Sequence, residues 1–306
     1  MSDKLRHSFC DQANRRNKAI KASSIVAVRR FAFAFVCSSA LAWASIAGAA
    51  DEVKIGGTGG ALGAMHLLAD AYQKLNPATR VTVLPSLGSG GGIKALLAGS
   101  IQIAVSSRPV RDKERSQGAV ELEYARTPFV FATAATTKDT GINITELAAF
   151  YSGKIESWPD GTRIRLVMRP QGDSDSDMIK SISAEVRAAK AEAEKRPGLL
   201  FAVTDQECAD ALEKYAGSFG PSTLGQILSE KRNLKVLRMN DVEPSVSALM
   251  AGSYPYYKSM YIVTTPKTPE AALKFMAFVQ SKAGQEILNR TGHAVPPFRR
   301  ADHAAS

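Results

Sequence analysis

Apolar and polar positions in the first half of the chain follow two periods in turn. In "DEVKIGGTGGALGAMHLLADAYQKL" a short apolar segment is followed by glycines, and then by apolar residues at helical spacing. "TRVTVLPSLGSGGGIKALLAGS" repeats this order, with a helix predicted over residues 91–98, and "IQIAVSSRPV" predicts a further strand. Strands that alternate with helices are typical of a parallel sheet with helices on its faces. We therefore expect an α/β fold.

Two segments after residue 120 predict crossings between lobes. "YARTPFVFATAATT" predicts a long apolar strand that enters a second lobe, and the aromatic end of "GSYPYYKSMYIVTT" predicts a strand that returns. Between them, "RIRLVMRPQGDSDSDMIKSISAEVRAAKAEAEKR" predicts a strand that leads into one long, charged helix. The last predicted helix, "PEAALKFMAFVQSKAGQEILNRTG", is amphipathic.

The first 50 residues have the pattern of an export signal. A polar, basic segment over residues 1–30 precedes the apolar run "FAFAFVCSSALAWASIA" and the small residues "AGAA". This order is typical of a signal peptide, with cleavage expected near Ala49 or Ala50. An N-terminal membrane anchor is the alternative. We expect residues 1–50 to be a cleaved leader and the mature protein to be periplasmic.

The charge of the chain depends on this leader. The whole sequence has a net charge of +10, but residues 51–306 carry 31 Lys and Arg against 27 Asp and Glu, a net charge of +4. Most of the basic excess therefore belongs to the leader, and nucleic-acid binding is not indicated. Cys208 is the only cysteine after residue 50, which excludes an intramolecular disulfide in the mature chain.

Three Ser- and Gly-rich turns follow predicted strands. "GGTGGALGAM" fits a tight turn as well as a binding turn. In "LGSGGGIKALL", Ser89 occupies a helix N-cap position, and the glycines after it favour close approach of the backbone to a ligand. "VSSRPV" places Ser106 and Ser107 at a strand end, where either a cleft or solvent is expected. Open α/β sheets bind ligands at the carboxyl ends of their strands, so these turns are candidate binding segments.

A fourth candidate is the stretch "RPQGDSDSD". Arg169 has the side chain that best clamps an anion, because its planar guanidinium can hold two oxygens. Asp173, Ser174 and Asp175 can cap the helix that follows, where negative charge is favoured. The same carboxylates would repel an anion unless one of them is protonated or turned away.

Catalytic chemistry is poorly supported by the sequence. His66, His293 and His303 have no metal-ligand spacing, and Cys208 lies in no recognisable catalytic context. No nucleophile elbow is present, because "LGSGGG" lacks the residue required before the serine. We expect no catalytic residue, no metal and no cofactor.

Together these residues resemble the phosphate-binding, periplasmic components of ABC transporters, in the type II periplasmic binding protein superfamily. The resemblance covers most of residues 51–306 and rests on "GGTGGALGAM", "GSGGGIKALLAGSIQIAVSSRPV", "ITELAAFYSGKIESW", "VMRPQGDSD" and "GSYPYYKSMYIVTT", in family order. It implies two lobes that close over an oxyanion, each a mostly parallel sheet flanked by helices. Residues 51–128 with 255–300 would form the first lobe, and residues 129–254 the second.

The resemblance also implies a set of binding residues. Arg169 matches the family's arginine, and Ser107 stands where some members have an aspartate that accepts the proton of hydrogen phosphate. Asp173, Ser174 and Asp175 replace a Ser-Gly-Thr segment. The implied ligand-binding residues are Ala61, Leu62, Ser89, Gly90, Gly91, Ser107, Arg169, Asp173, Ser174 and Asp175.

Our hypothesis is a monomeric, non-enzymatic periplasmic protein that captures phosphate or a related oxyanion for an ABC permease in the inner membrane. An alternative keeps the fold but binds a cationic or zwitterionic solute through Asp173 and Asp175. A hydrolase or transferase that uses the cleft is a second alternative, and a structural or signalling protein that binds no solute is a third.

Overall fold

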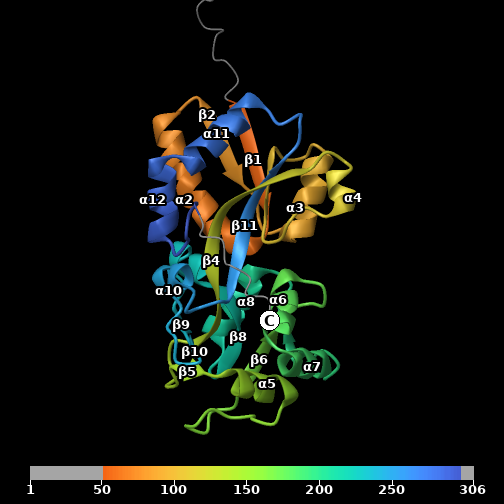
Figure 1. The fold of residues 1–306 in the computed structure, drawn as a ribbon, viewed down its shortest axis with the longest axis vertical. Coiled ribbons are helices and arrows are strands. Elements are labelled where there is room, and N and C mark those ends of the chain that lie inside the picture. Colours follow the sequence, from red (N-terminus) through yellow and green to blue (C-terminus); the bar gives the residue numbers. More distant parts are fainter. Residues whose placement is uncertain (1–50, 298–306) are drawn as a thin grey trace, which may run out of the picture. The chain divides into compact units, whose positions relative to one another are not determined.

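The computed structural model describes residues 51–297, so the predicted leader over residues 1–50 lies outside the described residues. Strands and helices alternate along this range (Figure 1). The elements up to the first long strand are β1 (Asp51–Gly57), α2 (Gly59–Leu75), β2 (Thr79–Val83), α3 (Gly88–Leu97), β3 (Ile103–Ser106), α4 (Asp112–Arg115) and β4 (Val120–Ala134). Next come β5 (Gly141–Ile142), α5 (Ile144–Ser152), β6 (Arg165–Met168), α6 (Ser174–Ile182), α7 (Ala184–Ala193), β7 (Leu200–Phe201), α8 (Asp205–Lys214) and β8 (Ser218–Thr223). The remaining elements are α9 (Leu224–Ser229), β9 (Leu234–Val236), β10 (Arg238–Met239), α10 (Val246–Ala251), β11 (Tyr257–Thr264), α11 (Glu270–Gln280) and α12 (Lys282–Arg290).

One mixed sheet runs through the described residues in the order β2-β1-β3-β11-β4-β8-β6-β7, with β9 beside β4. β1 is parallel to β2 and β3, and β6 is parallel to β7 and β8. β4 and β11 lie between these two parallel groups and are antiparallel to each other.

β4 and β11 connect the two groups, as the sequence predicted. β4 is 15 residues long. Its residues Val120 to Pro128 pair with β11, and Phe129 to Ala132 pair with β8. Figure 1 shows both strands passing from the upper to the lower part of the fold. Ser106 and Thr223, at the carboxyl ends of β3 and β8, pair with β11 and β4 near this junction. The carboxyl ends of both parallel groups therefore meet in the middle of the sheet.

Two sets of hydrophobic clusters lie on either side of the junction. One set takes its buried members from residues 53–125 and 260–288, and the other takes its members from residues 129–254. We call the parts of the chain around these sets lobe 1 and lobe 2; the domain limits expected from the sequence stay a prediction.

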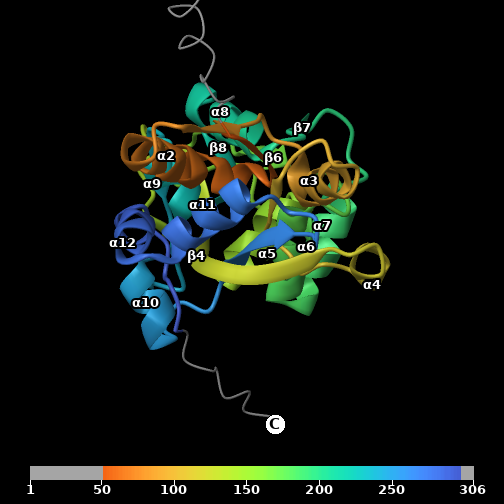
Figure 2. The ribbon, with the colours of Figure 1, turned by 90° about the horizontal axis from the view of Figure 1, so that it is seen from above.

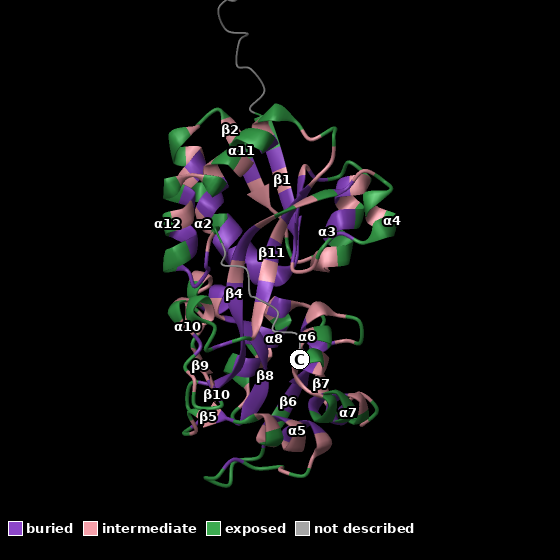
Figure 3. Cartoon of the chain, in the orientation of Figure 1, coloured by how far each residue is buried: buried purple, intermediate pink, exposed green. Residues whose placement is uncertain are grey.

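Strand alternation in lobe 1 gives both sheet faces an apolar surface. Val105 packs in the cluster with α2, α11 and α12, whereas its neighbour Ala104 packs in the cluster with α3. Figure 2 shows α3 separated from α2 and α12 across the strands, and Figure 3 shows buried strands beneath helices whose outer faces are exposed.

The structure differs from the sequence expectation at two helix starts. The long charged helix is broken into α6 and α7, because Ser183 adopts an extended conformation and its hydroxyl accepts a hydrogen bond from the Val186 amide. The helix expected over residues 91–98 begins at Gly88, with Leu87 as its N-cap. Ser89 therefore lies inside the first turn, and its hydroxyl accepts a hydrogen bond from the Ser107 amide instead.

Candidate functional site

A pocket of about 450 Å³ lies where the carboxyl ends of β1, β3 and β6 approach one another. We call this pocket the cleft. Its lining from lobe 1 includes Thr58, Gly88, Ser89, Gly90 and Ser107, and its lining from lobe 2 includes Gly172, Asp173, Ser174 and Asp205. The binding region expected at strand ends therefore contains residues from both lobes.

Hydroxyl groups from the two lobes meet in the cleft. The Ser107 hydroxyl lies 3.3 Å from Thr58 Oγ1 and 3.2 Å from Ser89 Oγ, both in lobe 1. It also lies 2.9 Å from Ser174 Oγ, in lobe 2. Each hydroxyl can donate or accept a hydrogen bond, so this group can adapt to a polar ligand that carries both oxygens and protons.

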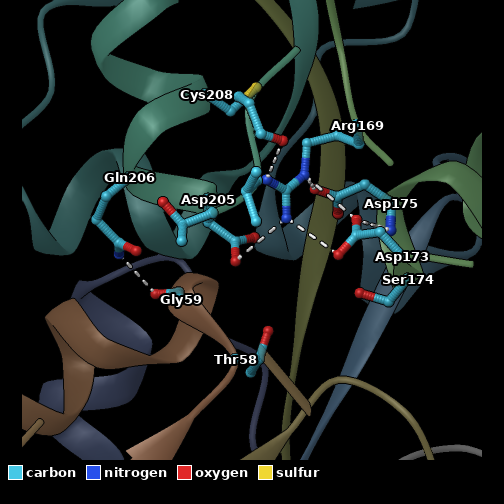
Figure 4. Close-up of polar contacts among 12 residues, drawn as sticks. Thr58, Gly59, Arg169, Asp173, Ser174, Asp175, Asp205, Gln206 and Cys208 are labelled. Atoms are coloured by element: carbon cyan, nitrogen blue, oxygen red, sulfur yellow. Dashed lines mark hydrogen bonds and ion pairs between the residues drawn. The ribbon is translucent and has the colours of Figure 1, made fainter. Parts of the chain in front are cut away.

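Arg169 follows β6 and is only 2% exposed. Its Nε lies 3.2 Å from Asp173 Oδ1 and 3.1 Å from Asp175 Oδ2. Its Nη2 lies 3.1 Å from Asp173 Oδ2 and 3.8 Å from Asp205 Oδ2, and its Nη1 donates to the Ala202 carbonyl. Figure 4 shows the guanidinium surrounded by these groups. Carboxylates of the protein thus pair with Arg169, the side chain predicted to clamp an anion.

Lys258, on β11, adds a second buried cation. Its Nζ contacts Asp175 Oδ1 and lies 3.0 Å from Ser174 Oγ. Asp175 is therefore shared between Lys258 and Arg169. We call Arg169, Asp173, Asp175, Asp205 and Lys258 the cleft cluster. When all its members are ionised, three carboxylates face two cations.

Burial and mutual repulsion distribute the protons of the cleft cluster unevenly. Burial, with Asp175 nearby, raises the pKa of Asp205 to about 6, and the same two causes raise the pKa of Asp173. Burial opposes ionisation of Asp175 as well, but Lys258 and Arg169 outweigh it, and the pKa of Asp175 is lowered. The extra negative charge therefore falls mainly on Asp205 and Asp173, which can take up a proton.

In the turn "RPQGDSDSD", Asp173 caps the following helix and also contacts Arg169. Asp173 is the N-cap of α6, and its Oδ1 accepts a hydrogen bond from the Asp175 amide at 2.9 Å. The same carboxylate contacts Arg169. Gly172 has a φ of +78°, a left-handed conformation that glycine adopts without strain and that turns the chain into the helix. Capping the helix therefore does not turn Asp173 away from the arginine.

The structure brings together only part of the predicted binding set. Ser89, Gly90, Ser107, Asp173 and Ser174 line the cleft, and Arg169 and Asp175 lie buried beside it. The other three lie outside its lining: the Ala61 amide donates to the Thr58 carbonyl, Leu62 lines a different pocket, and Gly91 is adjacent to Leu87. The binding roles of all ten residues stay predictions.

Several members of the site were not predicted from the sequence, among them Thr58, Asp205 and Lys258. Thr58 lies in the middle of the "GGTGG" turn, which drew attention for its glycines alone. Asp205 opens α8 directly after its cap Thr204, a position where an acidic residue has an ordinary helical explanation. Lys258 is the one charged residue in the aromatic strand "YPYYKSMY", and a lysine inside a strand that crosses between lobes was the available signal.

Known proteins support the class that this fold and cleft define, a two-lobed binding protein. A family model described as "PBP superfamily domain" (PBP for periplasmic binding protein) matches residues 44–283. The chain belongs to this superfamily, and the expected α/β fold of two lobes is confirmed.

One sequence relative and two solved structures are similar over most of their length. The phosphate-binding protein PstS of Borreliella burgdorferi is 27% identical over 79% of this chain and 90% of its own. A putative phosphate ABC transporter substrate-binding protein from Clostridium perfringens, solved with bound phosphate, has a TM-score of 0.69 at 19% identity and covers 80% of this chain and 100% of its own. An ABC-type phosphate transport receptor from Vibrio cholerae has a TM-score of 0.57 at 18% identity, with the same coverage.

Proposed function

We propose that the chain is a periplasmic, non-enzymatic receptor that binds inorganic phosphate in the cleft as a monomer and delivers it to an ABC permease. The names of the relatives support phosphate as the ligand. The hydroxyls of the cleft suit the oxygens of an oxyanion, and so does the start of α3, where Ser89 and Gly90 line the cleft.

The observation that carries this proposal is the excess of carboxylates in the cleft cluster. A ligand that brought only negative charge would be repelled by Asp173 and Asp205. Phosphate retains an acidic proton near neutral pH, so it can donate a hydrogen bond to a carboxylate while its other oxygens accept from hydroxyls and amides. Sulfate has no such proton at this pH. The cluster therefore favours phosphate over sulfate.

The alternatives from the sequence gain no comparable support. Asp173 and Asp175, the counter-ions expected for a cationic solute, are already contacted by Arg169, and Asp175 is also contacted by Lys258. For a hydrolase, no histidine or cysteine lines the cleft among residues 51–297.

The test is unfolding of the protein in urea with phosphate, sulfate or arsenate at pH 7. At a hundredfold excess over Kd, a ligand should add about 2.7 kcal/mol to the free energy of unfolding. Phosphate and arsenate should stabilise the protein and sulfate should not. Equal stabilisation by sulfate would remove the role of the ligand proton, and no stabilisation by millimolar phosphate would refute the assignment.

Two variants test whether Asp205 is the residue that discriminates between phosphate and sulfate. Asp205→Asn removes the carboxylate whose pKa is raised to about 6, so sulfate should bind better than it does to the wild-type protein. Asp70→Asn changes the same charge at an exposed position on α2 and should leave both ligands unaffected.

A further inference from the structure

Lobe 2 contains a second pocket, of about 380 Å³, that shares no lining residue with the cleft. It lies beside α5, β6 and β7, in the lower part of Figure 1. Its charged lining consists of Arg163, Arg165, Arg196 and Glu156. We call it the distal pocket. Its volume lies within the usual range of about 300–1,000 Å³ for small-molecule sites.

The arginines of the distal pocket have few internal partners. In residues 51–297, none of the three forms a salt bridge, although Glu156 lines the same pocket. Three guanidinium groups against one carboxylate leave an excess of two positive charges. The net charge of the distal pocket is therefore complementary to a dianion, whereas the cleft cluster contains more carboxylates than cations.

Arg196 is held in place by the end of α5. Its Nη2 donates to the Tyr151 carbonyl at 2.5 Å, and its Nη1 lies over Gly153, where an added Cβ would be 2.5 Å away. Its Nε is buried and has no hydrogen-bond acceptor among the described residues. One cation is thus oriented before any ligand arrives, and it retains an unused donor.

Arg165 and the apolar lining complete the pocket. The Arg165 guanidinium lies 5.9 Å from the centroid of the Tyr215 ring, a cation–π contact that leaves its donors without a carboxylate. Phe150, Leu166 and Leu199 contribute apolar surface beside the arginines. Positive groups next to an apolar wall suit a ligand with an anionic head and an apolar body.

We propose that the distal pocket binds a small phosphomonoester that carries an apolar body. The phosphate group matches the two excess positive charges, and guanidinium groups hold its oxygens in paired hydrogen bonds. The apolar body lies against Phe150 and its neighbours. This site is separate from the cleft, and the proposal does not depend on what the cleft binds.

The test is calorimetric titration of the full chain with phenyl phosphate, on a double variant and its matched control. Arg163→Gln with Arg165→Gln alters two exposed side chains of the distal pocket. Arg80→Gln with Arg290→Gln removes the same charge from exposed positions in lobe 1. The first pair should weaken phenyl phosphate binding about tenfold or more, and the control pair should change Kd less than twofold.

Two comparisons make the result decisive. Inorganic phosphate bound in the cleft should keep its affinity in the Arg163→Gln, Arg165→Gln variant. Methyl phosphate should bind the distal pocket about tenfold more weakly than phenyl phosphate, because it lacks most of the apolar body. The proposal is overturned if both double variants bind phenyl phosphate equally, if the wild-type protein does not bind it at millimolar concentration, or if methyl phosphate binds as well.

Discussion

Arg169, beside the cleft, is 2% exposed and lies among three carboxylates. Arg163, Arg165 and Arg196 line the distal pocket together with a single glutamate and form no salt bridge among the described residues. Both groups are in lobe 2, and both lie around β6. In the cleft cluster, Arg169 and Lys258 are paired with carboxylates of the protein, and there is one more carboxylate than there are cations. In the distal pocket the positive charge is stabilised by solvent, or by a ligand when one binds.

Burial explains this difference. A buried cation needs carboxylates and hydrogen bonds within the protein, since removing it from water without them is very unfavourable. Arg163 and Arg165 are exposed, so water stabilises them and no internal partner is required. Arg169, which the sequence predicted to bind an anion, is therefore paired within the protein. Arg163 and Arg165, which no motif marked, have no salt-bridge partner among the described residues.

The largest effect should come from Arg169→Ala. It leaves Asp173, Asp175 and Asp205 close together without the one cation that contacts all three, and removing one partner of a buried ion pair typically costs about 3–5 kcal/mol. Urea unfolding at pH 7 measures the loss. Arg165→Ala is the control, because an exposed side chain should change the free energy of unfolding by less than about 0.5 kcal/mol. Similar losses of unfolding free energy in both variants would contradict the proposed difference between the buried Arg169 and the exposed Arg165.

Asp205→Asn should have the opposite sign. The pKa of Asp205 in the folded protein is about 6, above its ordinary value near 4. The ionisation of Asp205 therefore lowers the free energy of unfolding as the pH rises from about 4 to 6. At pH 7 the variant should be roughly 1–3 kcal/mol more stable than the wild-type protein. Below pH 4 this difference should disappear.

Urea unfolding between pH 4 and pH 8 follows this change. Asp70→Asn, at an exposed position, should show a constant difference from the wild-type protein across the same range. A stability difference for Asp205→Asn that does not depend on pH would mean that Asp205 is not the carboxylate that holds the extra charge.

Much of the fold follows from local patterns in the sequence. The spacing of apolar residues predicted strands that alternate with helices. The length of the apolar segment "YARTPFVFATAATT" indicated that β4 crosses between the lobes. The break between α6 and α7 was missed, because a serine is compatible with a helix interior. Ser183 separates the two helices through its extended conformation and through the hydrogen bond that its hydroxyl accepts from the Val186 amide.

The site was harder to predict because it depends on contacts across long sequence separations. Ser89, Ser107 and Ser174 could be predicted, because they lie in turns that come after strands. Lys258 reaches Asp175 from 83 positions away, and Asp205 approaches Arg169 from the start of another helix. No local pattern records which carboxylates share one guanidinium. The sequence therefore indicated the arginine and its aspartates but not that they neutralise each other.

A smaller effect is expected from Ser107→Ala. The Ser107 hydroxyl lies within 3.3 Å of hydroxyls in both lobes, and its loss should lower the free energy of unfolding by about 1 kcal/mol. Phosphate affinity should fall about tenfold if this hydroxyl also contacts the ligand. Ser116→Ala, which removes an exposed hydroxyl in lobe 1, is the control. Unchanged phosphate affinity would exclude Ser107 from the binding set.

The smallest effect concerns salt. Because two arginines of the distal pocket are exposed, ions screen their attraction for a phosphomonoester over a Debye length of about 10 Å at 0.1 M. Raising sodium chloride from 50 to 300 mM should weaken phenyl phosphate binding about threefold. Phosphate binding in the cleft should change less, since the charges of the cleft cluster are largely buried and Arg169 and Lys258 are already paired. Calorimetry at both concentrations measures the two responses, and equal salt dependence would mean that the distal arginines are as enclosed as Arg169.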